Sequence, residues 1–515
     1  MRRYFLPILL LLVLSAPFVI QRLMPEEVSP AEKDGSSIRL VVVTPHNQDI
    51  RRLFASAFDE WHRKKFGQGV ILDYRMPGGA NDIKRLLETT YGSFMKAGHL
   101  PPESEINTGL DIVWGGGDYF FDQELKPLGI LKPLELDAKL LHEAFPSPAL
   151  AGVRLYEGTD RPRWIGICLS SFGIVYNPDL YRTLDLPEPR GWEDLTSPKL
   201  DDLVILADPT HSGSAAVAYM VVVQRAMADA EAEFLAHHSK KDPGYDQAIA
   251  RGWKIGMGRL LLIAANARNF VDSAPLVPND VGNGEAAAGI AIDFYGRIYQ
   301  ESVGAKRCKV IMPAGATAIT PDPIAVLYGV RDEKLLVARH FVEFLLTPEA
   351  QRLWNIVLPD GRSLRRLPIR ADVYANRAGW ADDIDPFTES HGFNQRGEWM
   401  TLFGDLLPIW AAAWIDSRDE LRDAYHAILK VRDGKVRGEL LAELSDLPIE
   451  MADVAALRNE RKRIEASGSS QLWKAQQRLA WTKRFREHYQ DVETKAGKRF
   501  GFQSQLFGRE IRFKH

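Results

Sequence analysis

Cysteine is almost absent from this sequence, which has only Cys168 and Cys308 in 515 residues. Two thiols cannot make the disulfide framework that holds small secreted domains together, and their spacing does not decide whether they form a single bridge. An excess of charge of one sign is also absent, because the formal net charge is −3, and this argues against nucleic acid as a partner. The chain is 45% hydrophobic and 26% charged, which indicates a globular protein of about three structural units.

Catalytic signatures are missing as well. The sequence has no Gly-x-Ser-x-Gly elbow, no His-Glu-x-x-His helix, no phosphate-binding Walker loop and no closely spaced set of metal ligands. We therefore expect a protein that is not an enzyme and that has no resident cofactor.

A long hydrophobic run occurs at the N-terminus. Arg2 and Arg3 precede an uncharged apolar stretch over residues 4–20, which is typical of an export signal. The stretch is also close to the shortest length that spans a membrane. Residues 1–24 are thus predicted to be a signal peptide or an anchor in the inner membrane, and the protein to be periplasmic or otherwise extracytoplasmic. Mass spectrometry of the mature N-terminus distinguishes cleavage from tethering.

Apolar runs alternate with amphipathic stretches after residue 38. Residues 38–47 read as a buried strand that ends in polar residues, residues 70–79 as a strand with a Pro-Gly-Gly exit, and residues 111–118 as a strand that ends in a glycine run. Residues 49–66 and 81–91 between them have helical spacing. This order predicts a parallel sheet covered by helices. Residues 164–177 read as one long strand interrupted at Ser170 and Ser171, and residues 284–288 as a small helix. Residues 369–515 are expected to form a helical extension.

Polar residues follow the predicted strands where the strands end, which is where open α/β sheets bind ligands. The loop from Pro209 to Ser214 runs into a predicted helix, whose free N–H groups and dipole favour an anion. Gly115, Gly116 and Gly117 could turn their amides inward as a second anion-binding element. Ser212 and Ser214 could equally be helix caps, and the glycines a tight turn.

His46, Asp293 and Tyr295 suggest a second chemistry. Imidazole, carboxylate and phenolate together suit a cation such as ferric iron. We rank it below an anion because the sequence has no closely spaced ligand motif and a lone histidine at a strand end is more often an ordinary hydrogen-bonding residue. Asp293 and Arg297 could instead form a structural ion pair where two lobes meet.

Seven ordered segments carry a resemblance to a known family: VVVTPHNQDIRRLFASAFDEW, DIVWGGGDYFFD, GICLSSFGIVYNP, LADPTHSGS, GEAAAGIAIDFYGR, PDPIAVLYG and HFVEFLLTPEAQRLW. The sequence resembles the type II periplasmic solute-binding proteins of ABC importers, in the branch that binds iron, polyamines or phosphorylated sugars. The resemblance implies two α/β lobes joined by crossing strands, with lobe one at residues 38–168 and 305–368 and lobe two at 169–304. Ferric-binding members carry adjacent tyrosines late in the second lobe, whereas the corresponding segment DFYGR of this sequence supplies Tyr295 alone.

The expected function is capture of a small solute in a cleft between the lobes, followed by transfer to an ABC transporter permease. The solute would be an anion or phosphorylated compound, or ferric iron. The alternative is a membrane-tethered sensory or scaffolding protein that uses the same fold. The predicted ligand-binding residues are Thr44, His46, Asn47, Gly116, Gly117, Ser170, Ser171, Ser212, Gly213, Ser214, Asp293 and Tyr295.

Overall fold

A computed structural model describes residues 37–95, 99–388, 392–393, 395–400, 402–465 and 470–510 of the chain. The predicted signal peptide or anchor at residues 1–24 lies outside these ranges. Within them, no helix combines the length and the apolar character needed to cross a membrane.

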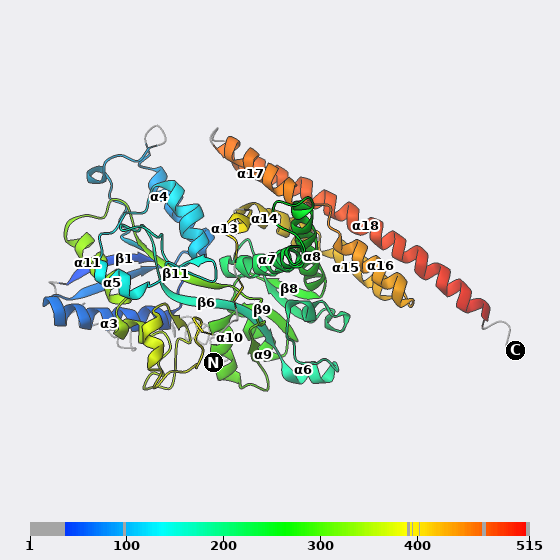
Figure 1. The fold of residues 1–515 in the computed structure, drawn as a ribbon, viewed down its shortest axis with the longest axis horizontal. Helices are drawn as coiled ribbons and strands as arrows, with labels where there is room; N and C mark the ends of the chain where they lie inside the picture. Colours follow the sequence, from blue (N-terminus) through cyan, green and yellow to red (C-terminus); the bar gives the residue numbers. More distant parts are fainter. Residues whose placement is uncertain are drawn as a thin grey trace, which may run out of the picture.

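The first lobe is built on a parallel sheet, as the alternation of strands and helices predicts. Strands β1 (Ile38–Val43), β2 (Val70–Arg75) and β3 (Ile112–Trp114) lie in the order β2-β1-β3, and β1 is parallel to both neighbours. Helices α3 (Gln48–Phe66) and α4 (Ala80–Gly92) connect them (Figure 1). Because the strands run the same way, the loops that follow β1 and β3 meet at one edge of the sheet.

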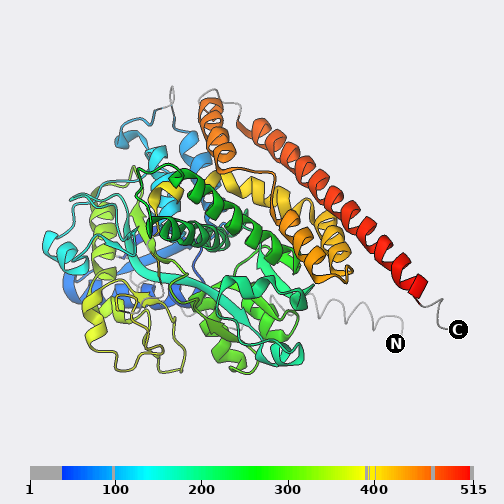
Figure 2. The same ribbon diagram turned by 45° about the vertical axis from the view of Figure 1, so that its right-hand side comes forward.

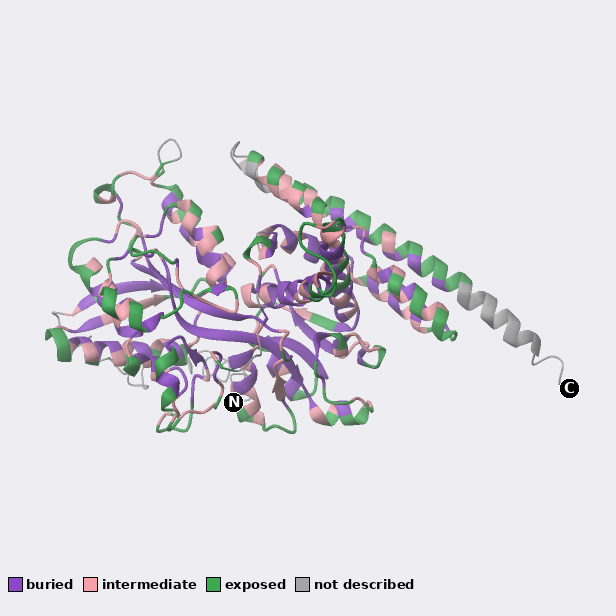
Figure 3. Cartoon of the chain, viewed as in Figure 1, coloured by how far each residue is buried: buried purple, intermediate pink, exposed green. Residues whose placement is uncertain are grey.

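Two long strands join this lobe to the second. Strand β6 (Ile165–Tyr176) pairs with β11 (Ile319–Val326) over its first half, and with β9 (Ala288–Ile292) over its second half. The expected interruption at Ser170 and Ser171 is wrong, because β6 is continuous and buried throughout (Figure 3). These two serines mark the point where β6 changes its pairing partner.

The second lobe continues the sheet in the order β6-β9-β7-β8, with helices around it. Its elements are β7 (Val204–Ala207), α7 (Gly213–Leu235), α8 (Tyr245–Ala265), β8 (Ala267–Val271), α9 (Leu276–Asn283), α10 (Asp293–Val303) and β10 (Lys309–Ile311). The small helix expected at residues 284–288 is wrong. Gly284 ends α9 in the left-handed conformation (φ 82°), and the buried alanines after it lead directly into β9.

Shorter elements complete the two lobes. They are β4 (Ala149–Leu150), β5 (Val153–Arg154), β12 (Leu367–Pro368), α5 (Ala138–Ala144), α6 (Pro178–Thr183), α11 (Asp332–Leu345) and α12 (Pro348–Arg352). Cys168 and Cys308 are both buried and free, so the single bridge that the sequence left open is not formed.

The hydrophobic core is divided at the crossing strands. One cluster of buried side chains includes Leu169 of β6 and Ile319 of β11. The other cluster includes Phe172 of β6 and Ala318, the residue just before β11. The division on β6 is close to the expected boundary at residue 169. On the return path it falls at residue 318 instead of residue 305, because β10 pairs with the second half of β6.

The helical extension expected at residues 369–515 is present only from α13 onward among the described residues, and its helices pack on the second lobe. Residues 369–388 instead contain a single short 3-10 helix, Ala371–Ala375, because they pack along lobe one. The helices of the extension are α13 (Gly397–Met400), α14 (Phe403–Trp410), α15 (Arg418–Leu429), α16 (Gly434–Ser445), α17 (Met451–Glu465) and α18 (Ser470–Glu510). Trp410 contacts Tyr219 of α7 with ring centroids 5.9 Å apart, and its indole N–H points at the Met257 sulfur 3.4 Å away. Helix α18 runs along the outside of α15 and α16 (Figure 2). These helices and lobe two therefore share one hydrophobic core.

This shared core predicts that α18 stabilises the second lobe. Phe485 is completely buried, and we expect Phe485→Ala to lower the free energy of unfolding by about 3–5 kcal/mol. Leu479, on the same helix, is 70% exposed, so Leu479→Ala should change stability by less than about 0.5 kcal/mol. Urea unfolding of both variants measures the difference, and equal effects would contradict the packing of α18 on this core.

Candidate functional site

A cavity of about 630 Å³ lies between the two lobes, on top of the crossing strands. Its walls come from the loops after β1, β3 and β7, the starts of α4, α7 and α10, and residues of β6 and β11. The lobes are in contact beside it, because the Asn81 side-chain amide of α4 donates to the Thr210 carbonyl oxygen at 2.6 Å. A Cβ added at Gly79 would lie 2.8 Å from the His211 carbonyl oxygen, so this approach requires glycine.

Most of the residues predicted from the sequence line this one cavity. They are His46, Asn47, Gly116, Gly117, Ser170, Ser212, Gly213, Ser214 and Tyr295. Their convergence follows from the topology, since the ends of the parallel strands face the same cleft. Thr44, Ser171 and Asp293 are not among the lining residues, and each instead supports a neighbour from behind.

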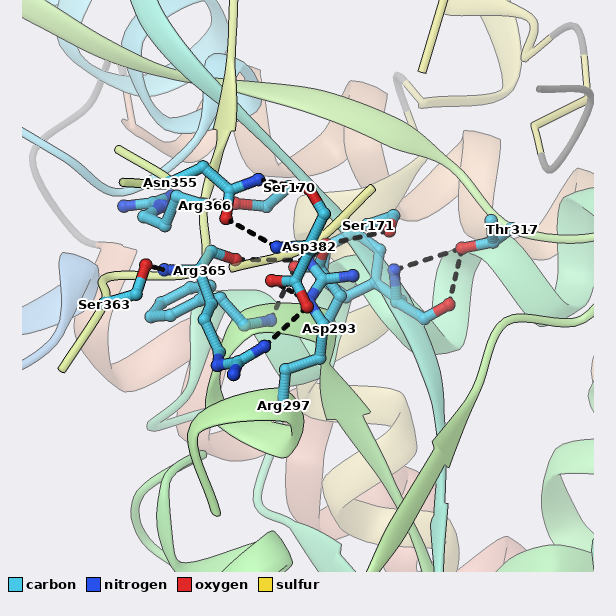
Figure 4. A network of polar contacts seen from close by, with 12 residues as sticks. Ser170, Ser171, Asp293, Arg297, Thr317, Asn355, Ser363, Arg365, Arg366 and Asp382 are labelled. Atoms are coloured by element: carbon cyan, nitrogen blue, oxygen red, sulfur yellow. Dashed lines mark hydrogen bonds and ion pairs between the residues drawn. The ribbon is translucent and has the colours of Figure 1, made fainter. Parts of the chain in front are cut away.

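Asp293 is buried at the start of α10, and its carboxylate is bound by other residues of the protein. Its carboxylate forms an ion pair with Arg297 at 2.5 Å and accepts hydrogen bonds from the Ser171 hydroxyl at 3.1 Å and the Phe294 N–H at 2.8 Å (Figure 4). The structural ion pair considered above is therefore present. Asp293 and Ser171 tie α10 to the crossing strand.

Thr44 orients His46, which does line the cavity. The Thr44 hydroxyl lies 2.9 Å from His46 Nδ1, and His46 Nε2 lies 2.8 Å from Asp322 Oδ2. Burial lowers the pKa of His46 in spite of Asp322, and nearby Arg366 and Arg51 lower it further. The neutral ring then accepts from Thr44 at Nδ1 and donates from Nε2 to the carboxylate.

Four helix starts are directed at the cavity. Helices α3 and α7 are capped by Asn47 and Ser212, whose side chains accept from Ile50 N–H and Ala215 N–H, and α4 and α10 begin at lining or adjacent residues. The first N–H groups of a helix lack intrahelical partners and carry partial positive charge. Ser212 is therefore both the N-cap of α7 and a residue that lines the cavity. The helix-cap and ligand-contact interpretations of this residue are compatible.

The triple glycine adopts the conformation that only glycine accepts readily. Gly115, Gly116 and Gly117 have φ values of 96°, 121° and 85°, and a Cβ at Gly116 would meet the Phe120 ring at 2.7 Å. The Gly116 N–H donates to Asp322 Oδ1 at 3.0 Å. The loop therefore brings backbone to the cavity wall at a point where a side chain would not fit.

A buried ion pair at the base of the cavity was not found from the sequence. Arg366 is 3% exposed, and its guanidinium contacts Asp322 Oδ2 at 2.6 Å and the Ser170 hydroxyl at 2.8 Å. It also lies over the Phe294 ring, 4.5 Å from the centroid, and its Nε is buried without a hydrogen-bond partner. The sequence does contain a feature that could have predicted this ion pair. Arg365 and Arg366 lie between apolar residues, and a buried arginine needs a specific partner.

The charges of this site are set by their mutual contacts. Burial would raise the pKa of Asp322, but Arg366 and His46 together hold this pKa below its ordinary value. Burial raises the pKa of Asp118, which also lines the cavity, to about 7. Burial likewise raises the pKa of Tyr295, so its phenol stays protonated at neutral pH.

Chemically, the cavity offers hydrogen-bond donors: helix starts, a glycine loop, hydroxyls and the Arg366 guanidinium. Iron chelation needs a phenolate, which the raised pKa of Tyr295 opposes, and the described residues contain no cluster of three or more His, Cys, Asp or Glu suited to a metal ion. The arrangement suits an anionic group held by amides, hydroxyls and a guanidinium.

Comparison with protein families finds a match for the central part of the chain. Residues 118–358 match the model described as bacterial extracellular solute-binding protein, and the two lobes with their crossing strands have the type II solute-binding fold.

Two curated relatives are the phosphoglycerate transport regulatory proteins PgtC of Salmonella typhimurium and Salmonella typhi. Each is 23% identical over 209 residues, which are 40% of this chain and 44% of the relative. The matched part thus spans less than half the length of these relatives.

Solved structures with a similar arrangement include the periplasmic binding protein AfuA and the protein HitA. AfuA from Actinobacillus pleuropneumoniae, with fructose-6-phosphate bound, is 19% identical with a TM-score of 0.48, covering 72% of this chain and 97% of that one. Iron-bound HitA from Pseudomonas aeruginosa is 17% identical with a TM-score of 0.46, covering 72% and 99%.

The Arg366–Asp322 pair predicts a large cost for removing its acid. We expect Asp322→Asn to lower the free energy of unfolding by about 3–5 kcal/mol at pH 7, because Arg366 is left buried without a counter-ion. An aspartate whose pKa is lowered in the folded state contributes stability above its ordinary pKa of about 3.9 and loses it below. The difference between wild type and variant should therefore shrink as the pH falls below about 4.

Asp272 provides the matched control. It also lines the cavity, but its side chain is 87% exposed, so Asp272→Asn should stay within about 0.5 kcal/mol of the wild type. Denaturant unfolding at pH 7 and at pH 3 measures both variants. A pH-independent difference for Asp322→Asn would contradict the lowered pKa.

Proposed function

From the match of residues 118–358 to the bacterial extracellular solute-binding protein model, we propose that the chain captures a small phosphorylated anion and delivers it to an ABC transporter permease. Capture would take place in the cavity between the lobes. Binding proteins of this kind shift from open to closed forms as the ligand bridges the two halves.

The observation that carries this proposal is the convergence of donors on one cavity. The starts of α4, α7 and α10, the glycine loop and the Arg366 guanidinium all reach the same space of about 630 Å³. Such a volume suits a small molecule. Phosphate binds well where helix N-termini, nests of backbone N–H groups and an arginine meet, because it needs several donors and a positive field at once.

A cationic solute fits this cavity less well. Asp322 is neutralised by Arg366, and Asp118, with its pKa raised to about 7, is only partly ionised at neutral pH. The remaining lining acids, Asp82 and Asp272, are 41% and 87% exposed. A polyamine would need closely placed carboxylates, and ferric iron would need an ionised phenol at Tyr295.

Ser170, Ser212 and Ser214 are proposed to contact the ligand through their hydroxyls, together with Asn47 and the amides of Gly117 and Gly213. The Gly116 N–H is instead occupied by Asp322. Phe172, Phe294 and Tyr295 add an aromatic surface that suits the carbon skeleton of an organic phosphate. Thr44, Ser171 and Asp293 are proposed to act indirectly, by holding His46 and α10 in place.

Export and membrane attachment rest on residues 1–36, which lie outside the described ranges. We propose a protein that acts outside the cytoplasm, at the inner membrane that carries the permease. The tethered sensory or scaffolding role needs the N-terminal run to remain as an anchor, and nothing in the described residues favours it.

Calorimetry with 3-phosphoglycerate, fructose 6-phosphate, ferric citrate and spermidine tests the proposed ligand class. We expect a phosphate ester to bind and the cation spermidine not to bind. Arg366→Gln should weaken binding of the phosphate ester by about 10- to 100-fold, because a hydrogen bond to a charged group contributes about 1.5–3 kcal/mol. Arg366→Lys should lose less, since it keeps the charge.

Two serine variants separate a local contact from a change in stability. Ser214→Ala removes a hydroxyl that lines the cavity, and we expect affinity to fall by about fivefold, which corresponds to a neutral hydrogen bond of about 1 kcal/mol. Ser302→Ala removes a hydroxyl of α10 that donates to the Tyr299 carbonyl oxygen outside the cavity, and it should bind like the wild type. Tight binding of spermidine or ferric citrate, with no phosphate ester bound, would overturn the proposal.

A further inference from the structure

We propose that Arg365 is a positioning residue, which presents Arg366 to the cavity and makes ligand affinity depend on Glu301 of the opposite lobe. This inference rests on the proposed function, because Arg366 is taken as the residue that meets the anion. The two arginines are adjacent in the chain, but their side chains have different partners. Arg366 contacts Asp322 and Ser170 at the cavity, whereas Arg365 contacts Glu301 of lobe two.

The backbone of Arg365 is held in an unusual conformation. Its φ is 51°, in the left-handed region that residues with a side chain seldom adopt. Three hydrogen bonds hold the turn: Arg365 N–H donates to the Ser363 hydroxyl, Arg366 N–H donates to the Trp354 carbonyl oxygen at 2.9 Å, and Arg297 donates to the Arg365 carbonyl oxygen at 3.2 Å. A strained residue held from several sides is a common sign of a functional constraint.

The side chain of Arg365 is held by two carboxylates. Its Nε and Nη2 contact the two Glu301 oxygens at 3.0 Å each. Its Nη1 donates to Asp382 Oδ1 at 2.6 Å (Figure 4). Such two-pronged pairing fixes the direction of the guanidinium as well as its position. Arg365 is 14% exposed on its side chain, so the pair is partly shielded from water.

The arginine turn and its partner Glu301 belong to different lobes. Leu364 and Leu367, on either side of the two arginines, belong to the core of lobe one, whereas Glu301 lies on α10, which packs on β9 and β10 of lobe two. The Arg365–Glu301 contact and the bond from Arg297 therefore connect the lobes. Both depend on the relative orientation of the lobes seen in this structure.

Helix α10 connects the same contacts to the cavity. Its first turn carries Phe294, over which Arg366 lies, and Tyr295, and its later turns carry Arg297 and Glu301. One rigid helix thus touches the cavity at its start and holds the arginine turn farther along. Separation of the lobes would release the turn and allow Arg366 to leave its position between Asp322 and Ser170.

The test uses Glu301→Gln in the full-length protein, with 3-phosphoglycerate as the probe. We expect binding to weaken three- to tenfold, mainly through faster dissociation, although Glu301 is not among the residues that line the cavity. In the ligand-free protein, hydrogen exchange at the Arg366 amide should become faster, because the turn is less constrained. The melting temperature should remain close to that of the wild type.

Glu188→Gln is the matched control. Glu188 pairs with Lys309 at 2.6 Å within lobe two, and its side chain is 49% exposed, compared with 45% for Glu301. This variant should leave both affinity and Arg366 amide exchange unchanged. Arg365→Gln also removes the contact with Asp382, so it should weaken binding at least as much as Glu301→Gln. The double variant should bind no more weakly than Arg365→Gln, because that variant has already lost the Glu301 contact.

Two results separate the possible failures. If the wild type binds 3-phosphoglycerate and Glu301→Gln binds it equally well with unchanged amide exchange, the positioning role is overturned while the proposed function stands. If the wild type does not bind 3-phosphoglycerate, the choice of ligand fails, and amide exchange in the ligand-free variants still decides whether Glu301 constrains the arginine turn.

Discussion

The buried contact between Arg366 and Asp322 is the constraint on which the rest of the site depends. A guanidinium that is 3% exposed can be held in the protein only with a counter-ion, and Asp322 provides it from β11. The same carboxylate accepts from the Gly116 N–H and contacts His46, so one acid brings the β1 loop, the β3 loop and the hinge together. The loops that end separate strands therefore form one wall.

A second consequence of this pair concerns the ligand. Because Asp322 already balances Arg366, the base of the cavity holds no large excess of positive charge. Under the proposed function, recognition of an anion relies on many weak donors: helix starts, glycine amides and hydroxyls. Such a set can release its ligand as well as bind it, as the proposed transfer to a permease requires.

The C-terminal helices make the second lobe larger without enclosing the cavity further. Trp410, Trp414, Phe485 and Tyr489 extend the core of lobe two outward, so these helices should move with that lobe when the cleft opens. Residues 371–388 instead follow lobe one, where Ile384 and Phe387 pack, and Asp382 reaches the arginine turn at the hinge. The extension therefore contacts both halves of the molecule.

Much of this arrangement could be predicted from the sequence, because it depends on local patterns. Apolar runs separated by amphipathic stretches gave the strands and helices, and the polar residues at strand ends gave most of the cavity lining. The two lobes were implied by the resemblance to solute-binding proteins. The sequence alone could not show that Asp293 is occupied by Arg297 and Ser171, since a buried ion pair and a ligand contact use the same residue types. It also gave no means to join Arg366 to Asp322, which lie 44 positions apart. Their pairing, the continuity of β6 and the left-handed turn at Arg365 were decided only when distant segments packed together, because each requires a partner from elsewhere in the chain.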